Sequence, residues 1–576
     1  MTQISNTVRA MSMGYAFGIV LCLGFALVPN AGAQVLYGSL TGTISDATKA
    51  AVPNAPVTVL DQGTGATRGT TTNAQGEYRV GDLPPGVYSI IVEQTAGFSK
   101  YTQKNVVVSV NQENRIDVTL QLSSVSAEVT VNTAAPMLQT EDAQVNHYIS
   151  QSQIAELPVG SSQGRNFQAL YTLIPGAANV VEQNSTASNP SRAMSVNVNG
   201  VEDMSNTTRI DGAVNTYGWL PYLIAYVPPA DSIQSVNVVT NSFNAEQGVA
   251  GGAAINVTIK SGTRDFHGSA WEYNQIFNTN ARGYINTPQA LPQVPKNIFN
   301  QFGFSIGGPV YIPKILTGKN KLFFFDAFER TTRRQLITAS GPLTVPTPAL
   351  LGGDFSAATN LTGAARTVLY DPQPGGVPVT GPTAQNGYLL PQFRTTTFQS
   401  EYGCNCIPKS RQFPGSATML GLLQPISATI TNPNYQNQLV GDYGSGSGTL
   451  AYNRNTNDAK ITYNPSDRTS IFGRYSIEPF TVTDPQELGA AGGGTFDGGQ
   501  PGAAAGRIQN VGLGMSHVIT PNMVVDADFG YTRQVTGAQS TIDIADGDFG
   551  LNVLGIPGTN GPGINYVGQP SLMFTG

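Results

Sequence analysis

DSIQSVNVVTNSFNAEQGVAGGAAINVTIKSGT, residues 231–263, is the stretch from which the rest of the chain can be interpreted. Its first part, residues 233–239, nearly alternates apolar and polar side chains, a pattern that predicts a half-buried strand. A patch of small residues follows, in which glycine permits close backbone approach or a positive φ. A second strand is predicted at Ala254–Ile259, just before a Lys-Ser-Gly-Thr sequence. The stretch therefore predicts two strands joined through a glycine patch.

A short strand that ends in a turn is predicted upstream, at Arg-Ile-Asp-Gly, residues 209–212. This turn, followed by strand, glycine patch, strand and Lys-Ser-Gly-Thr, resembles the plug domain of TonB-dependent outer-membrane receptors. The residues that carry the resemblance are Arg209, Asp211, Gly212, Gly248, Gly251 and Gly252. It implies that a plug occupies residues 140–263 and that the chain then enters a β-barrel. An ordinary soluble α+β domain with a glycine-rich turn is the alternative. Taken alone, Asp211 is interpreted as a turn or cap residue.

The composition suits an exported or membrane-embedded β protein. Only 11% of the 576 residues are charged, yet the mean hydropathy is −0.10. Typical soluble domains are about 25% charged. The polarity comes from uncharged side chains and 65 glycines, which fits strands with one apolar and one uncharged polar face. A secreted, loop-rich β protein would share these features. The net charge of −6 argues against nucleic acid as a partner.

Residues 1–33 are predicted to be a signal peptide. Arg9 supplies the positive charge, residues 15–28 the apolar run and residues 31–33 a small-residue cleavage site. After Gln34 no run reaches the roughly 18–20 apolar residues that a membrane helix requires. The mature chain is therefore expected to be exported, and to enter a membrane only as strands.

Residues 34–122 are predicted to form a β-sandwich, because short alternating strands recur with turn residues between them. The sequences TNAQGEYRV, residues 72–80, and LPPGVY, residues 83–88, resemble the carboxypeptidase-regulatory-like domain. That resemblance implies an immunoglobulin-like or carbohydrate-binding-like fold without peptidase activity, with Tyr78 and Tyr88 in the core. Sugar binding is implied only at the level of the family.

Residues 123–139 are predicted to be a linker that holds one extended segment: Glu128, Val129, Thr130 and Val131. The receptor resemblance implies a TonB box here, a short peptide that pairs with a strand of TonB through main-chain hydrogen bonds. TonB would in turn be coupled to its energising complex in the inner membrane. A last strand of the sandwich, or a plain linker, fits the same residues.

Within residues 140–263 we expect two helices, at 149–157 with Ser150 or Ser152 as cap, and at 164–174. Helical spacing assigns Phe167, Leu170, Tyr171 and Ile174 to the plug core. The loop at 213–229 carries three aromatic residues that are candidates to face a substrate, Tyr217, Trp219 and Tyr222. They would equally serve to pad the plug against a barrel wall.

Residues 264–576 are predicted to be the first part of an antiparallel transmembrane β-barrel. The sequences FGFSIGGPVYIPK, residues 302–314, and KNKLFFFDAFERTTRR, residues 319–334, resemble the first barrel hairpin of Oar-like TonB-dependent receptors. Alternation predicts seven strands, at 266–273, 300–307, 321–330, 456–463, 469–476, 506–518 and 523–532. A large plugged barrel has about 22 strands, so we expect the chain to be a fragment of its barrel.

Two polar segments are predicted to be loops outside the cell, at 333–448 and 488–506. The first contains Cys404 and Cys406, which either form a local disulfide or remain two unpaired thiols. No catalytic set, nucleotide-binding loop or metal-ligand set is apparent, so no enzyme activity, metal or cofactor is expected.

The sequence thus predicts a mainly β protein made of a sandwich, an α+β plug and a partial barrel. Its predicted location is the outer membrane of a Gram-negative-type bacterium, in contact with lipid, with the sandwich in the periplasm. The predicted function is TonB-dependent uptake of a large solute such as a glycan, an oligopeptide or a chelate. A role in surface adhesion or protein export is the alternative.

Overall fold

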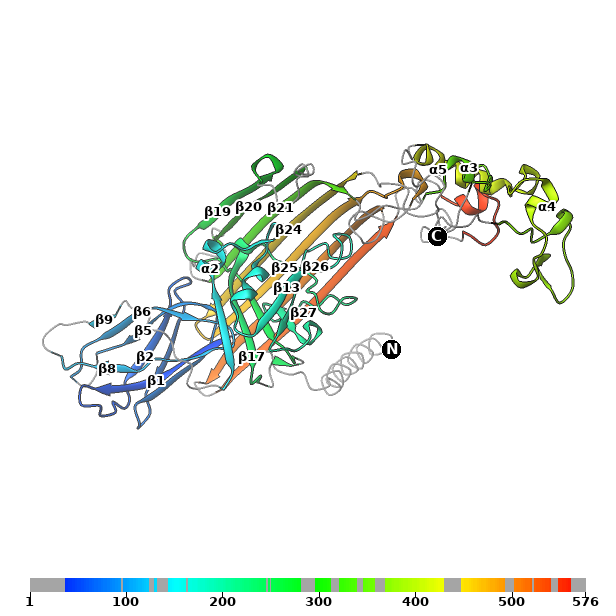
Figure 1. Ribbon diagram of the computed structural model, residues 1–576. Coiled ribbons are helices and arrows are strands. Elements are labelled where there is room, and N and C mark those ends of the chain that lie inside the picture. Colours follow the sequence, from blue (N-terminus) through cyan, green and yellow to red (C-terminus); the bar gives the residue numbers. More distant parts are fainter. Residues whose placement is uncertain are drawn as a thin grey trace, which may run out of the picture.

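The computed structural model describes residues 37–94, 97–123, 129–131, 143–161, 164–244, 247–248, 250–280, 296–311, 321–338, 345–357, 368–428, 447–492, 502–520, 523–539 and 547–560. The predicted signal peptide and Glu128 lie outside these residues. A long sheet forms the body of the molecule, with a sandwich at one end and helical loop segments at the other (Figure 1). The elements between β10 and β18 lie against one face of that sheet (Figure 1).

The sandwich packs two sheets around one core. The first sheet contains β1 (Gly38–Asp46), β4 (Glu77–Leu83), β7 (Glu113–Arg115) and β8 (Val118–Leu120). The second contains, in order, β3 (Thr67–Thr71), β2 (Pro56–Asp61), β5 (Gly86–Val92), β6 (Tyr101–Val108) and β9 (Val129–Val131). Tyr78 and Tyr88 are buried, as predicted, and their hydroxyls donate to the carbonyl oxygens of Ile116 at 2.8 Å and Pro84 at 2.7 Å.

The segment from β10 to β18, for which the name plug is kept from the prediction, is an α+β unit built on one five-stranded sheet, in the order β10-β17-β18-β15-β16. Its strands are β10 (Val145–Ser150), β11 (Gly160–Ser161), β12 (Gly164–Arg165), β13 (Ala177–Glu182), β14 (Met194–Val198), β15 (Thr207–Ile210), β16 (Ala213–Val214), β17 (Ile233–Asn241) and β18 (Ala254–Ile259). Its helical turns are α2 (Gln151–Glu156), η1 (Phe167–Leu173), η2 (Asp203–Ser205) and η3 (Ala230–Ser232). Strands β17 and β18 pair antiparallel, so the opening stretch of sequence forms the centre of this sheet.

Three expectations for the plug need correction. Strand β17 is buried on both faces rather than one, because its partners lie on both sides of the plug sheet. For example, the Asn237 side chain donates to the Val110 carbonyl of the sandwich at 2.7 Å. The second predicted helix is a 3₁₀ helix, capped by Asn166, although its four predicted core residues are buried. Strand β16 occupies the first two residues of the segment 213–229, which was predicted to be a loop.

Helix α2 begins two residues later than predicted, with one of the two predicted caps. Ser150 is its N-cap and forms a capping box with Gln153, in which each side chain bonds the other's backbone N–H. The helix is shorter than predicted because Ile149 and Ser150 belong to strand β10.

The long sheet is an antiparallel meander whose seven strands are neighbours in chain order. They are β19 (His267–Ile276), β20 (Asn297–Pro309), β21 (Leu322–Thr338), β24 (Ser447–Ser466), β25 (Thr469–Asp484), β26 (Gly502–Thr520) and β27 (Met523–Gln539). Each predicted strand overlaps one of them, but β24 has 20 residues and β26 has 19. Since about 9–11 residues cross a bilayer as a strand, the longer strands extend well beyond it.

We call this seven-stranded sheet the wall. The ends of its strands show which end of the wall the sandwich occupies. Strands β24 and β25 are joined by a tight turn, and Asp467 in that turn accepts from the Thr67 hydroxyl of the sandwich at 3.5 Å. The sandwich therefore docks on the short-turn end of the wall.

Among the described residues, every helix is too short or too polar to cross a membrane.

Helical segments at the opposite end replace much of the predicted long loop. Within that loop they are α3 (Pro348–Leu351), η6 (Pro374–Gly376), η7 (Pro391–Phe393), α4 (Phe398–Tyr402), η8 (Lys409–Arg411) and α5 (Pro414–Ser427). Strands β22 (Ala384–Gln385) and β23 (Tyr388–Leu389) form a small hairpin among them. Three further helical turns lie in other connections: η5 (Phe277–Thr279), η9 (Gly489–Ala491) and the π-helical turn η10 (Phe549–Val553). Both predicted loops are shorter than expected, because β21 continues to Thr338 and β26 begins at Gly502.

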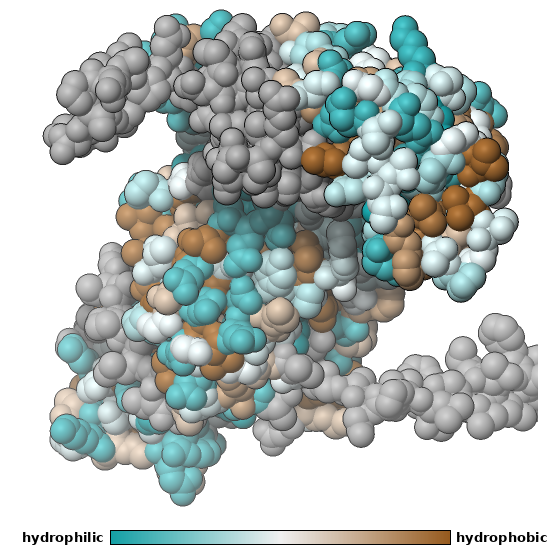
Figure 2. Space-filling view, turned by 45° about the vertical axis from the view of Figure 1, so that its right-hand side comes forward, coloured by the Kyte–Doolittle hydropathy of each residue, from teal (hydrophilic) through white to brown (hydrophobic). Residues whose placement is uncertain are grey.

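Met419 of α5 packs with Phe549 and Leu554, so segments distant in sequence form one unit, which we call the loop unit. On the coloured part of the face in Figure 2, hydrophobic residues are scattered among hydrophilic ones rather than gathered into one patch.

Candidate functional site

The plug and the wall are joined by a buried ion cluster centred on Asp211. This residue lies in the turn between β15 and β16, with a φ of 44°. Its Oδ2 lies 3.0 Å from Nε of Arg474 on β25, and its Oδ1 accepts from Nζ of Lys460 on β24 at 3.1 Å. All three side chains are less than a tenth exposed. A carboxylate of the plug is therefore held between two cations of the wall.

The two cations also bind the plug backbone. Arg474 donates to the Ile210 carbonyl at 2.9 Å, and Lys460 donates to the Ile259 carbonyl at 2.9 Å. Asn510 on β26 accepts from Arg474 as well. Buried charges are costly unless each has a partner and its remaining donors are bonded. This cluster meets that condition only while Asp211 stays seated, so it couples the position of the plug to the wall.

A second buried carboxylate, Asp458 on β24, lies next to the first cluster. Tyr226 and Ser232 of the plug each donate a hydroxyl to it at 2.8 Å. Ser476 on β25 donates to the same carboxylate. The contact therefore ties the plug segment that precedes β17 to two wall strands.

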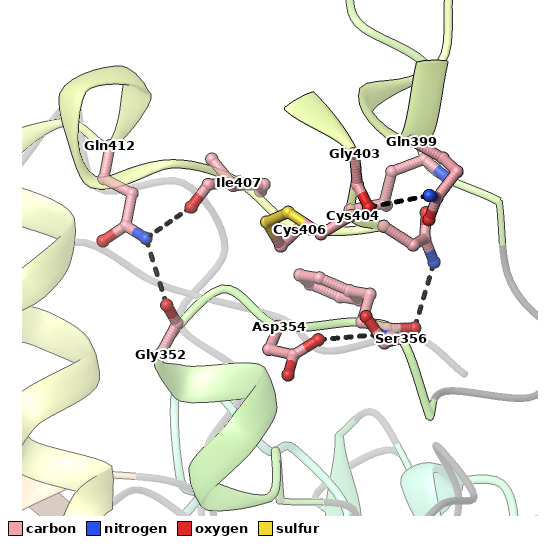
Figure 3. Close-up of a disulfide and its surroundings, with 12 residues drawn as sticks. Gly352, Asp354, Ser356, Gln399, Gly403, Cys404, Cys406, Ile407 and Gln412 are labelled. Atoms are coloured by element: carbon pink, nitrogen blue, oxygen red, sulfur yellow. Dashed lines mark hydrogen bonds between the residues drawn. A yellow bond between two sulfur atoms is a disulfide. The ribbon is translucent and has the colours of Figure 1, made fainter. Parts of the chain in front are cut away.

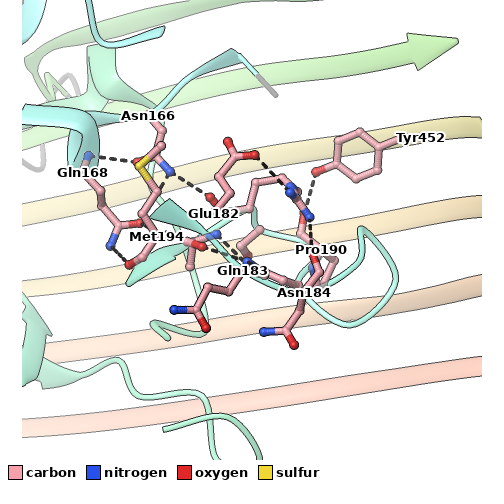
Figure 4. Close-up of polar contacts among 12 residues, drawn as sticks. Asn166, Gln168, Glu182, Gln183, Asn184, Pro190, Met194 and Tyr452 are labelled. Atoms are coloured by element: carbon pink, nitrogen blue, oxygen red, sulfur yellow. Dashed lines mark hydrogen bonds and ion pairs between the residues drawn. The ribbon is translucent and has the colours of Figure 1, made fainter. Parts of the chain in front are cut away.

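The third contact lies nearer the loop end of the wall and involves the plug segment between β13 and β14. Tyr452 donates to the Pro190 carbonyl at 2.5 Å, and Arg454 donates to the Ser191 carbonyl at 2.7 Å. The Ser191 hydroxyl donates to Glu478 at 2.5 Å. Figure 4 shows Tyr452 reaching from its strand towards Pro190, beside a network among polar plug residues.

Within that network, Asn166 donates to the Arg192 carbonyl at 2.8 Å. Gln168 bonds both the N–H and the C=O of Met194, at 3.0 Å and 3.1 Å (Figure 4). Arg192 pairs with Glu182 at 3.0 Å. These bonds hold the segment that meets the wall against the 3₁₀ helix η1.

The plug also contacts the β19–β21 side of the wall. Gln301 accepts from the Arg165 backbone at 2.8 Å and donates to Glu329 at 2.8 Å. A cavity of about 410 Å³ lies between α2 and the wall here, lined in part by Gln151, Lys260 and His267. Within the described part of the chain, both ion pairs between plug and wall lie on the β24–β25 side.

The glycines of the plug motif serve the geometry of this unit. Gly212 and Gly248 have φ values of 78° and 64°, in the left-handed region that glycine tolerates. A side chain at Gly252 would place its Cβ 2.5 Å from Oδ1 of Asn206, and one at Gly251 would lie 3.3 Å from Ser205. Arg209 is buried and donates to the Gln247 carbonyl at 2.8 Å. The motif therefore shapes the glycine patch, and Asp211 alone reaches the wall.

Two wall glycines, which the sequence did not single out, let the plug approach closely. A Cβ on Gly530 of β27 would lie 2.7 Å from the Cα of Ala213 in β16. A Cβ on Gly512 of β26 would lie 3.4 Å from the Asp211 carbonyl oxygen. Thr532 completes the contact by donating to the Val214 carbonyl at 2.6 Å.

The three candidate substrate-facing aromatics have different environments. Tyr217 is buried in the plug core and donates to the Ser188 carbonyl at 3.0 Å, so its ring is not presented to solvent. Tyr222 is partly buried and accepts from Asn184 at 2.7 Å. Trp219 is 69% exposed. Of the three, Trp219 is the one with a largely exposed side chain.

The sandwich, plug and wall meet around a cavity of about 200 Å³. It is lined by Asp61 and Pro85 of the sandwich, Ile259 of the plug, and Lys460 and Phe472 of the wall. Burial raises the pKa of the Asp61 carboxyl. Nearby, Arg264 donates to the carbonyl oxygens of Gly63 and Gln62 at 2.9 Å and 3.1 Å. The sandwich is therefore joined directly to the segment that links plug and wall.

Val129–Val131 of the TonB-box candidate forms β9, at the edge of the second sandwich sheet. It runs parallel to β6, with Thr130 opposite Thr102. The last residues of β6 adjoin the plug, whereas Tyr101–Gln103 lie at the opposite end of that strand (Figure 1). The segment is thus presented away from the wall, as an additional strand.

A disulfide joins Cys404 and Cys406 in the loop unit. Figure 3 shows hydrogen bonds on both sides of it: Gln412 donates to the carbonyl oxygens of Ile407 and Gly352, and Gln399 to that of Gly403. Asp354 accepts from the Ser356 backbone across the loop from the disulfide (Figure 3). Two loop segments are therefore held together around the disulfide.

Sequence reasoning missed the wall side of the site. Lys460, Asp458 and Arg474 occupy inward positions within the predicted strands, and Glu478 occupies an inward position of β25 just past its predicted end. Their shared signal is charge at alternate positions, which places several ionisable residues on one face of β24 and β25.

Comparisons with known proteins agree with this architecture. Residues 258–576 match the family described as outer membrane beta barrel domain, and residues 39–121 match the carboxypeptidase regulatory-like domain. The chain is 26% identical over 367 residues to the TonB-dependent transporter Oar of Myxococcus xanthus, covering 62% of this chain and 32% of that protein. The chain thus spans about a third of the length of this relative.

Two solved structures are similar at low identity. The outer membrane transporter YddB from Escherichia coli is 11% identical, with a TM-score of 0.37, and the match covers 70% of this chain and 40% of that one. A mutant of the ferric enterobactin receptor PfeA from Pseudomonas aeruginosa is 10% identical, with a TM-score of 0.30, and the match covers 68% and 45%.

Proposed function

The chain belongs to the outer-membrane β-barrel family, and from this premise we propose that it acts in TonB-dependent uptake of a large solute. The solute classes that fit are a glycan, an oligopeptide or a chelate. The wall would cross the outer membrane, the sandwich would lie in the periplasm, and the loop unit with Trp219 of the plug would meet the solute outside.

The observation that carries this proposal is the buried contact of Asp211 with Lys460 and Arg474. A plug that merely filled a wall would need only apolar packing. Here it is held by charges that lose their partners when it moves. Such a contact holds the plug against the wall at rest. A force applied to the plug can break all bonds of the contact together.

We propose that the force is applied through the segment Glu128, Val129, Thr130 and Val131. TonB would pair with this segment by β-augmentation, with the main chain supplying most of the affinity. The edge position of β9 supports this role, because one side of an edge strand is not paired within its own sheet.

The test is deletion of residues 128–131 in the full-length protein. Energised uptake of a labelled solute should be lost, while the amount of folded protein in the outer membrane is unchanged. Replacing the same residues with four that retain an extended conformation should preserve some uptake, because β-augmentation reads the main chain. Unchanged uptake after the deletion would count against this segment as the TonB box.

A second candidate function is adhesion or protein export at the cell surface. It is favoured by the loop unit, in which α3, α4 and α5 form an ordered structure with exposed Tyr388, Phe393 and Phe413. Removing residues 368–428 separates the two functions. A defect in cell adhesion with normal uptake of every labelled glycan and peptide tried would favour the second.

A further inference from the structure

The outer face of the wall changes character along its strands. Side chains alternate between faces of a strand, and Glu329, Arg454 and Arg474 face the plug, so the residues beside them in sequence point outwards. Towards the sandwich end the outward residues are apolar, for example Phe304, Ile461 and Phe529. Towards the loop end they become polar, and the apolar runs end at Asn300, Asn457, Gln509 and Arg533, and on β21 at Arg330, although Asp326 interrupts that run.

On the three neighbouring strands β20, β21 and β24, this boundary shifts by one outward position from each strand to the next. Asn300 lies opposite Thr332, one outward position beyond Arg330. Asn457 lies opposite Phe328, one outward position before Arg330. Barrel strands tilt by about 35–45°, so a line parallel to the membrane crosses the register in this stepwise manner. We therefore interpret the line as the outer edge of the apolar membrane core.

Beyond this line, the outward charges on the described strands all have the same sign. They are Arg330, Arg334, Arg507 and Arg533, each exposed. The outward acidic residues of the described wall are Glu272, opposite Phe302, and Asp326, opposite Ile306. Both of these lie on the apolar side of the line. The wall thus presents an uncompensated positive surface at the level of the outer-leaflet headgroups.

Arg507 and Arg533 are the closest pair in this surface. Arg507 lies opposite Val535, and Arg533 lies opposite Gln509, so the two arginines are diagonal neighbours on adjacent strands. Such neighbours are roughly 7–8 Å apart, a distance that one anion can bridge. Neither side chain has an acidic partner within the described part of the chain. Like charges this close favour an external counter-ion.

We propose that Arg507 and Arg533 bind a phosphate of an outer-leaflet glycolipid. Planar guanidinium groups match phosphate oxygens in a bidentate manner, and they are more weakly hydrated than an ammonium group. The acyl chains of the same lipid would lie over Leu513, Phe529 and Tyr531, the exposed apolar residues on the membrane side of the pair. Arg330, three strand spacings from Arg507, would contact the neighbouring headgroup.

The experiment compares the full-length protein, purified from outer membranes in detergent, with its R507Q/R533Q variant. Binding of diphosphorylated lipid A and of its dephosphorylated form is measured by native mass spectrometry. The unmodified protein should bind the phosphorylated lipid at least tenfold more tightly than the dephosphorylated one. The double variant should lose that preference.

The matched control is R79Q/R468Q, which removes one arginine from β4 of the sandwich and one from the turn between β24 and β25. It should bind both lipids as the unmodified protein does. Gel mobility with and without heating shows whether each variant is folded. Equal binding of the two lipids by the unmodified protein, or a retained preference in folded R507Q/R533Q, would overturn the proposal. Binding of inorganic phosphate alone with the same affinity would assign the pair to a free anion instead.

Discussion

Asp211 of the plug and Arg474 of the wall form an ion pair, with 3.0 Å between Oδ2 and Nε, inside a region from which solvent is almost fully excluded. The pair is not isolated, because Lys460 bonds the other carboxylate oxygen and both cations reach plug carbonyls. The position of the plug and the charge balance of the wall are therefore set by the same contact.

Replacing Asp211 with Asn should unseat the plug. The change leaves two buried cations without a carboxylate, and breaking a buried ion pair from one side typically costs about 3–5 kcal/mol. We expect cells that carry D211N to admit a large antibiotic that the intact outer membrane excludes. Growth inhibition by that antibiotic is the measurement.

The control for this change is Glu202→Gln, which removes a carboxylate from an exposed position of the same plug. It should leave the antibiotic excluded. If D211N also excludes the antibiotic at normal expression, the ion cluster does not hold the plug.

Gly530→Val should disturb the plug in a different way, by collision. The new Cβ would lie 2.7 Å from the Ala213 backbone, which has no flexible side chain to move aside. The same substitution at Gly537, on the same strand, meets no atom within 4 Å. We expect antibiotic entry with G530V and none with G537V; equal behaviour of the two variants would contradict the close approach of β16 and β27.

The strands of the wall were predictable from sequence because alternation is a local signal. Phe302, Phe304 and Ile306 mark one face of β20 without any knowledge of their neighbours. Strand lengths were underestimated, since β24 continues past its apolar part with Asn453 and Asn455 on the outward face. Those residues lie beyond the apolar band and carry no hydrophobic pattern.

The ion cluster was not predictable in the same way. Asp211 was interpreted as a turn residue, and its φ of 44° agrees with a turn. Its partner Lys460 is 249 residues away in sequence. No local pattern connects two such residues, and only the packing of the plug against the wall brings them together. The sequence left open whether Tyr217 faces a substrate or packs inside, and its hydroxyl partner is in another plug loop, which no local pattern indicates.

Cysteines at Thr102 and Thr130 should crosslink under oxidising conditions. These residues are opposite each other in the β6–β9 pair, and adjacent strands lie about 4.8 Å apart, within reach of a disulfide. Cysteines at Thr102 and Val131, one residue out of register, should crosslink poorly. The readout is mobility of a proteolytic fragment with and without reductant.

If the segment must leave β6 to meet TonB, the 102–130 crosslink should also stop uptake until it is reduced. Uptake that continues through the crosslinked protein would mean that TonB binds β9 in place. Failure of the crosslink to form would contradict the pairing itself.

Tyr78→Phe should destabilise the sandwich without affecting the wall. The change removes a hydroxyl that donates to the Ile116 carbonyl at 2.8 Å in the core, and an unsatisfied buried acceptor costs about 1–3 kcal/mol. Urea denaturation followed by proteolysis at the sandwich should shift to lower urea. Lys104→Gln, at an exposed position of β6, should not shift it. An unchanged midpoint for Y78F would show that the hydroxyl is satisfied elsewhere.

The central claim is that the seven strands of the long sheet are a wall whose outer face lies in lipid while its inner face holds the plug. Nitroxide labels at Leu513 and Phe529 test it most directly, by their collision rates with oxygen, which partitions into lipid, and with a water-soluble nickel complex. We predict high oxygen and low nickel collision rates at both sites, and the reverse at Lys104 of the sandwich. Nickel collision rates at Leu513 and Phe529 as high as at Lys104 would contradict the account.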